Sequence, residues 1–457
     1  MSVYTTNAKS AYARALGFYS ITAIPGAVIS VLLGTYFLIY ATDVLLIAPA
    51  VIGTMIAAGR IYDAFTDVAI ATWSDRVAGR WGRRRPFIIA GGVLMIFHGA
   101  LWLPPENFSE TATLVWIGVM ILVWQTASTL RTIPLRALGI ELGQTPERRS
   151  WFITIMSLVG LPAMVGGHWL MQHFVDSPDA RATGAPWFIG LGLVMAALNL
   201  TLGWFIKELP ADQRTVERKP IAMMKEVLSV GYHRQLISVQ FIESIAFGSL
   251  IFSIAYMLTY VLDRPDQMAT IAVTYQLVYE FSKLGWLRMI PRWGMTRIWR
   301  VGFVLWLCMF VAVPFVLVGG FKLYLALAVA AGFAGGASVV NYAMLGDIAD
   351  YDARQSGRQR QGIYMTIYEL VTKIGHALTV FLLGWMLQLA GFVPNVEQGP
   401  AVIAAIIVAS SLIPFIGVLF GLRILRHYRF YETEGISDGR REFLGHATLG
   451  KVVATAA

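Results

Sequence analysis

Residues 44–72 read VLLIAPAVIGTMIAAGRIYDAFTDVAIAT, an apolar stretch that contains only three charged residues, Arg60, Asp63 and Asp67. A transmembrane helix needs about 20 apolar residues, whereas a barrel strand needs about 10 with strict alternation, so this stretch predicts a membrane-spanning helix. A charged side chain at the bilayer centre costs roughly 2.5–3.5 kcal/mol on insertion scales. The three charges therefore mark a candidate functional site inside a span.

The rest of the chain has the same apolar character. Of its 457 residues, 57% are hydrophobic and 14% are charged, and the mean hydropathy is +0.63. An ordinary soluble domain carries about 25% charged residues, so a soluble enzyme is excluded. Exposed backbone is not tolerated in lipid, so we expect an all-α membrane protein. Twelve apolar segments follow one another, at 17–40, 44–72, 87–103, 111–140, 150–172, 184–206, 233–262, 268–290, 298–319, 322–346, 362–391 and 401–425.

The basic residues gather on one side of these segments. If the N-terminus is inside, the loops on the other face hold only Arg181 and Arg264 of the 36 lysines and arginines. Lysine and arginine accumulate on the cytoplasmic side of multi-pass proteins, so we expect both termini in the cytoplasm. The formal net charge of +9 then reflects orientation, and no nucleic-acid partner is expected.

A polar stretch at 207–232 divides the twelve segments into six and six. The pattern RxxxRWGxxR occurs after the second segment, from Arg76 to Arg85, and again after the eighth, from Arg288 to Arg297. A pattern that recurs at the same place in each half is the parallel repeat of a transporter whose halves rock about a central site. We therefore predict two pseudo-symmetric six-helix halves, 1–206 and 233–425, joined by a cytoplasmic loop at 207–232 and followed by a cytoplasmic tail, 426–457.

Asp63 and Asp67 are spaced i and i+4, so on a helix they form one stripe with Arg60. Two carboxylates held that close in a low dielectric repel each other, so either a cation lies between them or one is protonated. Oxygen donors suit a hard ion such as Na⁺, and the hydroxyls of Thr66 and Thr129 are further candidate ligands. The alternative is a purely structural ion pair with Arg60 or with a lysine of another helix.

A second charged stripe lies in segment 362–391, where Glu369, Lys373 and His376 are spaced i, i+4 and i+7. Lys373 is the obvious counter-charge for the aspartate pair. A cation that displaced it would change how the two halves pack, so we assign Arg60 and Lys373 to coupling. The alternative is that Lys373 pairs with Glu369 within its own helix.

Segment 111–140 carries a third group of polar side chains. Polar groups beside tryptophan are typical of a ligand cavity, and arginines there indicate a ligand with a carboxylate, sulfonate or phosphate. For Arg136 the alternative is a side chain that only reaches the cytoplasmic interface. The candidate solute-binding residues, together with a lone acid in segment 233–262, are Trp124, Gln125, Arg131, Thr132, Arg136 and Glu243.

Asp347 and Asp350 come directly after the apolar segment 322–346, and Arg354 follows them. This arrangement predicts a cytoplasmic gate made of ion pairs, and a solvated helix end is the alternative. Enzyme motifs are missing from the sequence: it has no Walker loop, no HExxH and no GxSxG, and Cys308 is its only cysteine. We therefore expect neither an enzyme nor a cofactor, apart from the coupling cation.

The stretch Gly59–Asp67, continued by Ser74-Asp75-Arg76 and by Arg80-Trp81-Gly82 through Pro86, resembles the glycoside–pentoside–hexuronide:cation symporters. This family is the melibiose-permease-like branch of the major facilitator superfamily. The likeness continues at Tyr40-Ala-Thr-Asp43, Thr132-Ile133-Pro134, Asp347-Ile-Ala-Asp350-Tyr351 and Lys373.

The resemblance implies cation-driven symport by alternating access in a bacterial inner membrane, with Na⁺, Li⁺ or H⁺ at Asp63 and Asp67 and with Lys373 beside them. The chain departs from the sugar-binding members, because it is apolar near Ile24-Pro25-Gly26 and has Thr132 in place of an acid. We therefore expect a monomeric symporter of a sugar-like, anionic solute. The alternative is a cation-coupled lysolipid or lipid translocator, since the same branch resembles lysophospholipid symporters.

Overall fold

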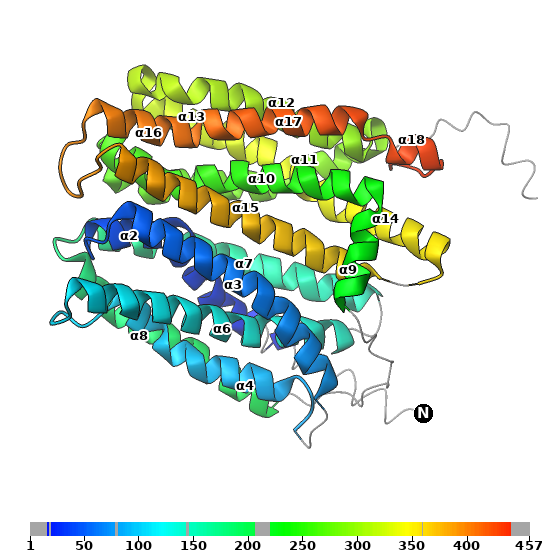
Figure 1. The fold of residues 1–457 in the computed structure, drawn as a ribbon, viewed down its shortest axis with the longest axis horizontal. Helices are drawn as coiled ribbons and strands as arrows, with labels where there is room; N and C mark the ends of the chain where they lie inside the picture. Colours follow the sequence, from blue (N-terminus) through cyan, green and yellow to red (C-terminus); the bar gives the residue numbers. More distant parts are fainter. Residues whose placement is uncertain are drawn as a thin grey trace, which may run out of the picture.

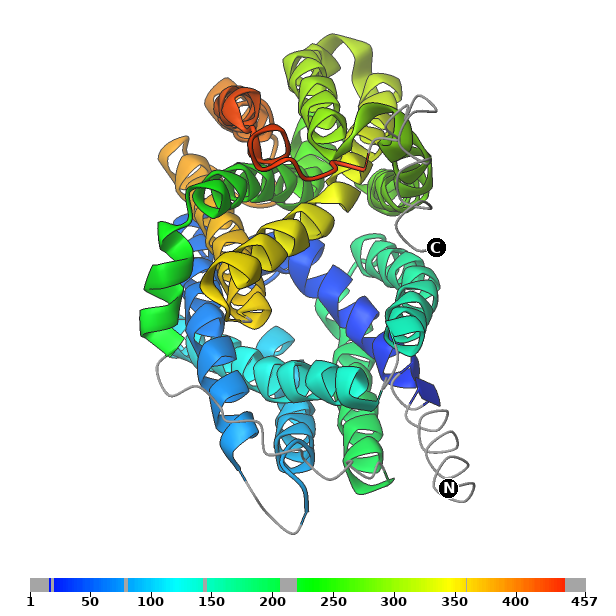
Figure 2. The same ribbon diagram turned by 90° about the vertical axis from the view of Figure 1, so that its right-hand side faces the viewer.

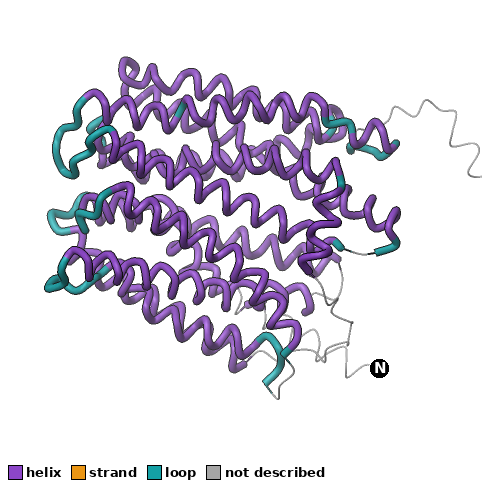
Figure 3. The backbone as a smooth tube through the Cα atoms, in the orientation of Figure 1, coloured by secondary structure: helices purple, strands orange, loops and turns teal. Residues whose placement is uncertain are grey.

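The computed structural model describes residues 16–17, 20–77, 81–142, 146–205, 220–358 and 360–439. Every regular element in these ranges is a helix, and no strand occurs in them (Figure 3). The helices run side by side along the long axis of the molecule (Figure 1). In lipid a helix satisfies its own backbone hydrogen bonds, which is why apolar runs of this length fold in this way. The predicted all-α membrane fold is confirmed.

The first half of the chain supplies six long helices. The first, Ser20–Asp43, includes a π-helical turn, η1 (Leu32–Tyr36), and ends as α2 (Phe37–Asp43). The third pass is α4 (Arg85–Leu94), continued through η2 (Met95–Phe97) into α5 (His98–Trp102). The other four passes of this half are α3 (Pro49–Arg76), α6 (Glu110–Leu142), α7 (Pro146–Val175) and α8 (Ala180–Phe205).

The second half begins with a short helix, α9 (Pro220–Ser229), before its own long helices. Its first pass is α10 (Gly231–Tyr256), continued by η3 (Met257–Val261), and its second is α11 (Met268–Trp293), preceded by η4 (Pro265–Gln267). The third pass is α12 (Met295–Ala312), continued by η5 (Val313–Phe315). The fourth pass consists of α13 (Val316–Gly335), η6 (Gly336–Val340) and α14 (Asn341–Ser356). The last two passes are α15 (Gln361–Leu389) and α16 (Pro400–Ser410) with α17 (Leu412–His427), and α18 (Phe430–Glu434) follows them.

Eight helical stretches are long and apolar enough to cross a membrane by length and composition. The longest, Met295–Ser356, contains two passes, because the chain reverses at Gly320, whose φ is 59°. The reversal brings Ala334 and Ala337 of the returning pass against Gly302 of α12. With α3, α7 and α11, which are as long but carry more polar residues, the described chain makes the twelve passes that the sequence predicts.

Three helix pairs join the first six passes to the last six: α3 packs on α15, α7 on α11, and the first helix on α10. Seen end-on, the passes of the two halves surround a common centre (Figure 2). The α3–α15 crossing is tight at Gly53 of α3 and Gly384 of α15. If Gly53 carried a Cβ atom, that atom would lie 3.2 Å from the Cα of Gly384. An added Cβ on Gly384 would overlap the carbonyl oxygen of Pro49. Small residues therefore allow α3 and α15 to approach closely enough for their charged side chains to meet.

The repeated sequence pattern is matched in the backbone. Gly82 follows α3 with φ 89°, and Gly294 follows α11 with φ 75°. A side chain is disfavoured in this left-handed region, so each position requires glycine. The boundaries that we predict for the two halves remain a prediction, and part of the loop that joins them lies outside the described residues.

Two regions differ from their predicted extents. The tenth pass continues ten residues beyond 346, to Ser356, where Gly357 caps it with φ 68°. The described residues after α17 pack on the helices: Phe430 is fully buried, and the Tyr431 hydroxyl donates to Asp347 Oδ2 at 2.8 Å. The start of the predicted tail therefore packs on the helix bundle, because its aromatic residues have apolar surface to bury.

Candidate functional site

Two carboxylates of α3 and one lysine of α15 form the central charged cluster. Lys373 Nζ donates to Asp63 Oδ2 at 2.6 Å and also to Asp67 Oδ2, so the ammonium lies between the two acids. The three side chains are only 16–22% exposed. An ammonium has three donors and no acceptor, so it neutralises one of the two negative charges and leaves the triad with a net charge of −1.

Thr129 of α6 completes this cluster, and Thr66 does not take part in it. The Thr129 hydroxyl donates to Asp63 Oδ1 at 2.7 Å, whereas the Thr66 hydroxyl donates to the backbone carbonyl of Asp63 at 3.0 Å. Asp63 therefore has both carboxylate oxygens engaged, one by Thr129 and one by Lys373. In this conformation the oxygen donors that face one another come from the two aspartates and Thr129.

The cluster forms one wall of a large cavity with a volume of about 690 Å³. A volume of this size accommodates a sugar-sized solute. The cavity extends from the aspartates in mid-helix to the end of the bundle where α3 ends, α15 begins and α9 lies (Figure 1). Its polar lining residues are Asp63, Asp67, Thr72, Ser128, Thr129, Thr132, Arg136, Thr366, Glu369 and Lys373.

Two of the predicted solute-binding residues, Thr132 and Arg136, line this cavity. Arg136 is exposed within it, across from Glu369 of α15. The Glu369 carboxylate accepts a hydrogen bond of 2.9 Å from the Tyr342 hydroxyl, and Lys373 is bound to the aspartates. The alternative in which Glu369 pairs with Lys373 inside α15 is therefore wrong for this conformation.

Trp124 and Gln125 face a second, smaller cavity of about 280 Å³, enclosed by the first helix, α3, α5 and α6. This cavity also includes Arg60, and it shares Asp63 and Ser128 with the large cavity. A third cavity, of about 200 Å³, lies on the other side of Arg60 between the two halves. Arg60 thus lies where the two smaller cavities meet, rather than among the carboxylates that it precedes in sequence.

Arg131 and Glu243 line none of these three cavities. An Nη nitrogen of Arg131 lies close to Gly26 of the first helix. Glu243 is buried inside the second half, where its Oε2 accepts from Trp299 Nε1 at 2.9 Å and from Asn341 Nδ2 at 2.8 Å. Glu243 therefore lies apart from the three cavities, and no ion pair joins it to a described arginine.

The predicted gate residues do not pair with one another. Asp350 Oδ1 accepts from Gln361 Nε2 at 2.6 Å, Asp347 is bound by a tyrosine, and Arg354 is exposed. Among the described residues, the ion pairs at this end of the bundle instead join Glu226 of α9 to Arg360, at 3.0 Å, and to Arg358, at 3.6 Å, and join Arg360 to Asp352 of α14 at 3.9 Å.

Sequence reasoning missed α9, which holds Glu226 and two methionines, Met223 and Met224, that line the large cavity. The segment lies in the polar stretch between the two halves, so hydropathy alone excluded it. Its sequence, PIAMMKEVLS, does place apolar residues three and four apart, which is the signal that would have identified an amphipathic helix.

At the opposite end of the bundle, hydrogen bonds hold the two halves together. The Tyr260 hydroxyl donates to Asp43 Oδ2 at 2.6 Å, and Asn395 Nδ2 donates to the Asp43 carbonyl at 2.8 Å. The hydroxyls of Thr42 and Tyr256 lie 3.0 Å apart. Passes 1, 7 and 11 of the chain therefore meet where the loops are short, which closes this end.

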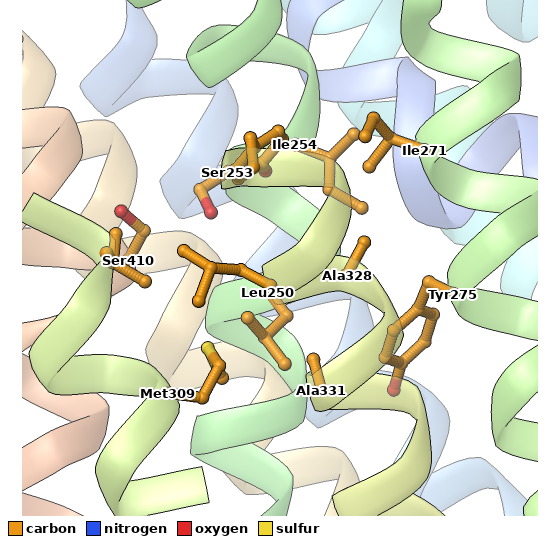
Figure 4. A pocket seen from close by; sticks show the side chains of 12 residues that line it. Leu250, Ser253, Ile254, Ile271, Tyr275, Met309, Ala328, Ala331 and Ser410 are labelled. Atoms are coloured by element: carbon orange, nitrogen blue, oxygen red, sulfur yellow. The ribbon is translucent and has the colours of Figure 1, made fainter. Parts of the chain in front are cut away.

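Two further features of the described chain are poor candidates for a solute site. A cavity of about 30 Å³ among α10, α12 and α13 is lined mainly by apolar side chains such as Leu250, Met309 and Ala331 (Figure 4), and it is too small for a sugar-sized solute. In the described part of the chain, no group of three or more histidine, cysteine or acidic residues is placed to hold a metal ion. Neither feature competes with the large cavity as a solute site.

Residues 18–432 match the family described as MFS/sugar transport protein, so the chain belongs to this family of the major facilitator superfamily. It is similar to an uncharacterised symporter of Bacillus subtilis, YnaJ, at 25% identity over 413 residues, 87% of this chain and 88% of that protein. It is also similar to the glucuronide carrier protein homolog of Escherichia coli, at 24% identity over 420 residues, 87% of this chain and 88% of that protein.

Among solved structures, the chain is similar to a bacterial homolog of the human lysosomal transporter Spinster in an inward-facing and unoccupied conformation. The TM-score is 0.66 and the identity 16%, over 95% of this chain and 98% of that one. The protein is therefore a multi-pass secondary transporter with the major facilitator fold and not an enzyme, and the resemblance to the glycoside–pentoside–hexuronide:cation symporters is confirmed.

Proposed function

We propose that the protein is a cation-coupled symporter of a small anionic organic solute, with the coupling cation bound between Asp63 and Asp67. One observation carries this proposal: Lys373, from the other half of the chain, fills the space between the two acids in a cavity large enough for a solute. The Lys373 ammonium carries the same positive charge as the coupling cation, so the cation can take its place between Asp63 and Asp67.

Coupling follows from this competition. A cation that enters between the acids displaces Lys373 and so removes the contact that ties α15 to α3 at mid-membrane. A ligand shifts a conformational equilibrium only by its differential affinity for the two states. The cation has such a differential affinity, because it can bind the aspartate oxygen atoms only in the state in which Lys373 has left them. Thr129, already bound to Asp63, is the third oxygen donor of the site.

The two ends of the bundle support an assignment of the conformation. The short-loop end is closed by Asp43, Tyr260 and Asn395, and the large cavity reaches the other end. The excess of basic residues in the loops at that other end supports a cytoplasmic location for it, in the inner membrane of a bacterium. The conformation is then inward-facing, and the two six-helix halves would rock about the cavity to open the opposite end.

The solute class rests on the charges of the cavities. Arg136 lines the large cavity, and the position occupied by an acid in sugar-binding relatives is Thr132 here. A glucuronide, the solute named for the similar Escherichia coli protein, combines a sugar ring with a carboxylate. An acidic sugar or a comparable hydroxylated acid therefore fits better than a neutral glycoside. A lysolipid stays as an outcome of the test, because the family resemblance includes lipid symporters.

The test is uptake by proteoliposomes that contain the full chain, with sodium or proton gradients imposed one at a time. Radiolabelled D-glucuronate, methyl β-D-glucoside and lysophosphatidylcholine serve as probes. We expect gradient-driven accumulation of the acid, which Asp63→Asn and Asp67→Asn each abolish, and normal uptake in the control Glu280→Gln, whose acid is paired with Lys283 outside the three cavities. Uptake that ignores both gradients, or that survives in both aspartate variants, contradicts the proposal.

A further inference from the structure

Arg60 is a half-buried cation that interacts electrostatically with Asp63 but forms no ion pair with a described residue. Its Nε is buried and has no hydrogen-bond partner, and its guanidinium lies 5.5 Å from the ring centroid of Phe252. Asp63, one turn along α3, is the nearest candidate partner in sequence. Both oxygens of that carboxylate are already engaged, by Thr129 and Lys373, and Arg60 makes no ion pair with any described residue. A partly buried charge without an ion pair is costly and calls for a functional explanation.

The guanidinium faces two cavities that are suited to a ligand. Arg60 lines both, and Ser30 and Gly34 of the first helix separate them. Each cavity contains another buried nitrogen without a partner, Trp124 Nε1 in one and His168 Nδ1 in the other. Buried polar groups in native structures are normally satisfied, so an unpartnered nitrogen beside each of the two cavities that flank Arg60 supports the presence of a ligand there.

The cavity that contains Arg60 and Trp124 adjoins the large cavity at Asp63 and Ser128. Its volume of about 280 Å³ is enough for a carboxylate or sulfonate with a few carbon atoms, and Gln125 adds an amide to its wall. A solute that enters through the large cavity can therefore place one end beside Arg60 while the rest of it remains among Thr132 and the other polar residues of the larger space.

Charge balance gives the pocket a role in coupling. The charged residues that line the large cavity, together with Arg60, are three cations and three anions: Arg60, Arg136, Lys373, Asp63, Asp67 and Glu369. Without ligands the site is neutral, and one bound cation makes it +1. In a low dielectric such an excess charge is expensive, and an anion at Arg60 removes it. The empty and the fully loaded sites are then both neutral, which favours one-to-one movement of cation and anion.

We infer that Arg60, with Trp124 and Gln125, forms the pocket that binds the anionic group of the solute, and that this group is a carboxylate or sulfonate. The inference rests on the proposed function and deepens it. Arg136 has a different role, since it is exposed in the large cavity, where water screens its charge. A guanidinium in a desolvated pocket binds a carboxylate or sulfonate with two parallel hydrogen bonds, which makes Arg60 the specific contact.

The experiment measures binding of a small anion to the purified full chain by thermal shift. Sodium methanesulfonate replaces sodium chloride at constant ionic strength, and dimethyl sulfone is the neutral control. We expect methanesulfonate to raise the melting temperature saturably by about 2 °C, and the sulfone to have no effect. Arg60→Gln should abolish the rise, Trp124→Phe should weaken the apparent affinity about fivefold through the lost indole donor, and Arg136→Gln should retain the rise.

Two results overturn the inference: an equal rise in Arg60→Gln, or no saturable rise in the wild-type protein. If Arg60→Gln does not fold, Trp124→Phe decides the question, and an unchanged affinity in that variant rejects the pocket. Failure of symport is a separate result. If methanesulfonate binding depends on Arg60 but no gradient drives uptake, the pocket is supported and the proposed function is rejected. If Arg60→Gln takes up an acidic sugar normally, the proposed function is supported and the pocket is rejected.

Discussion

Replacing Lys373 by methionine tests the central claim that an internal ammonium competes with the coupling cation. Lys373 makes one charge-assisted hydrogen bond to each aspartate, and such a bond contributes about 1.5–3 kcal/mol. Because the side chains are 16–22% exposed, we discount the two together to about 2–3 kcal/mol. A cation that enters the wild-type site must replace both bonds, so Lys373→Met should bind it about 30–150-fold more tightly.

The purified full chain is titrated with NaCl, with LiCl and with acid, and calorimetry measures the affinity for each cation. Lys283→Met is the matched control, because Lys283 also pairs with an acid inside a span, Glu280 at 2.9 Å, but lies outside the three cavities. In proteoliposomes, Lys373→Met should lose net uptake, because the cation-free carrier then holds two unpaired carboxylates. It should retain exchange of bound solute.

An unchanged or weaker affinity of Lys373→Met for all three cations refutes this reasoning. The ammonium would then support the site rather than compete for it. The same affinity gain in Lys283→Met would refute it as well, since the effect would not be specific to the aspartate pair.

Three further substitutions separate the cation site, the fold and the helix crossing. Thr129→Val removes the donor to Asp63 Oδ1 and should weaken cation binding about 5–10-fold in the same titration, with little change in melting temperature. Glu243→Leu leaves the buried Trp299 Nε1 without its acceptor and removes one of the two acceptors of Asn341 Nδ2. It should cost about 1–3 kcal/mol, seen as a lower melting temperature, while the KM of the folded fraction stays unchanged. Gly384→Ala would press on the Pro49 carbonyl and should reduce cross-linking between cysteines placed on α3 and α15; unimpaired cross-linking would count against the tight crossing.

Much of the fold could be read from hydropathy. The predicted segment 111–140 corresponds to α6, Glu110–Leu142, and 362–391 corresponds to α15, Gln361–Leu389. The prediction works because each helix in a bilayer must satisfy its own backbone hydrogen bonds. The length and hydropathy of each span can therefore be read from the local sequence. The tenth pass was predicted too short for the same reason: the acids after residue 346 end the apolar run, but the helix continues beyond the apolar part to Ser356.

The candidate site was predictable only in part. The spacing of Asp63 and Asp67 identified the stripe, and two charges in need of neutralisation identified Lys373, which lies 310 residues from Asp63 in the chain. The partners of the other charges were not predictable. Glu243 turns to a tryptophan and an asparagine of its own half, and the ion pairs at the end of the bundle use Glu226 of α9.

By itself, the sequence determined that this chain crosses a membrane as helices, which side of them carries the positive charge, and which ionisable groups are held in the spans. Only the tertiary structure decided which charges meet: Lys373 joins the aspartates, whereas Arg60 lines two cavities and forms no ion pair with a described residue. The physical reason is that the cost of burying a charge depends on one residue and its depth, whereas the partner that offsets this cost depends on the rotation and packing of helices distant in sequence.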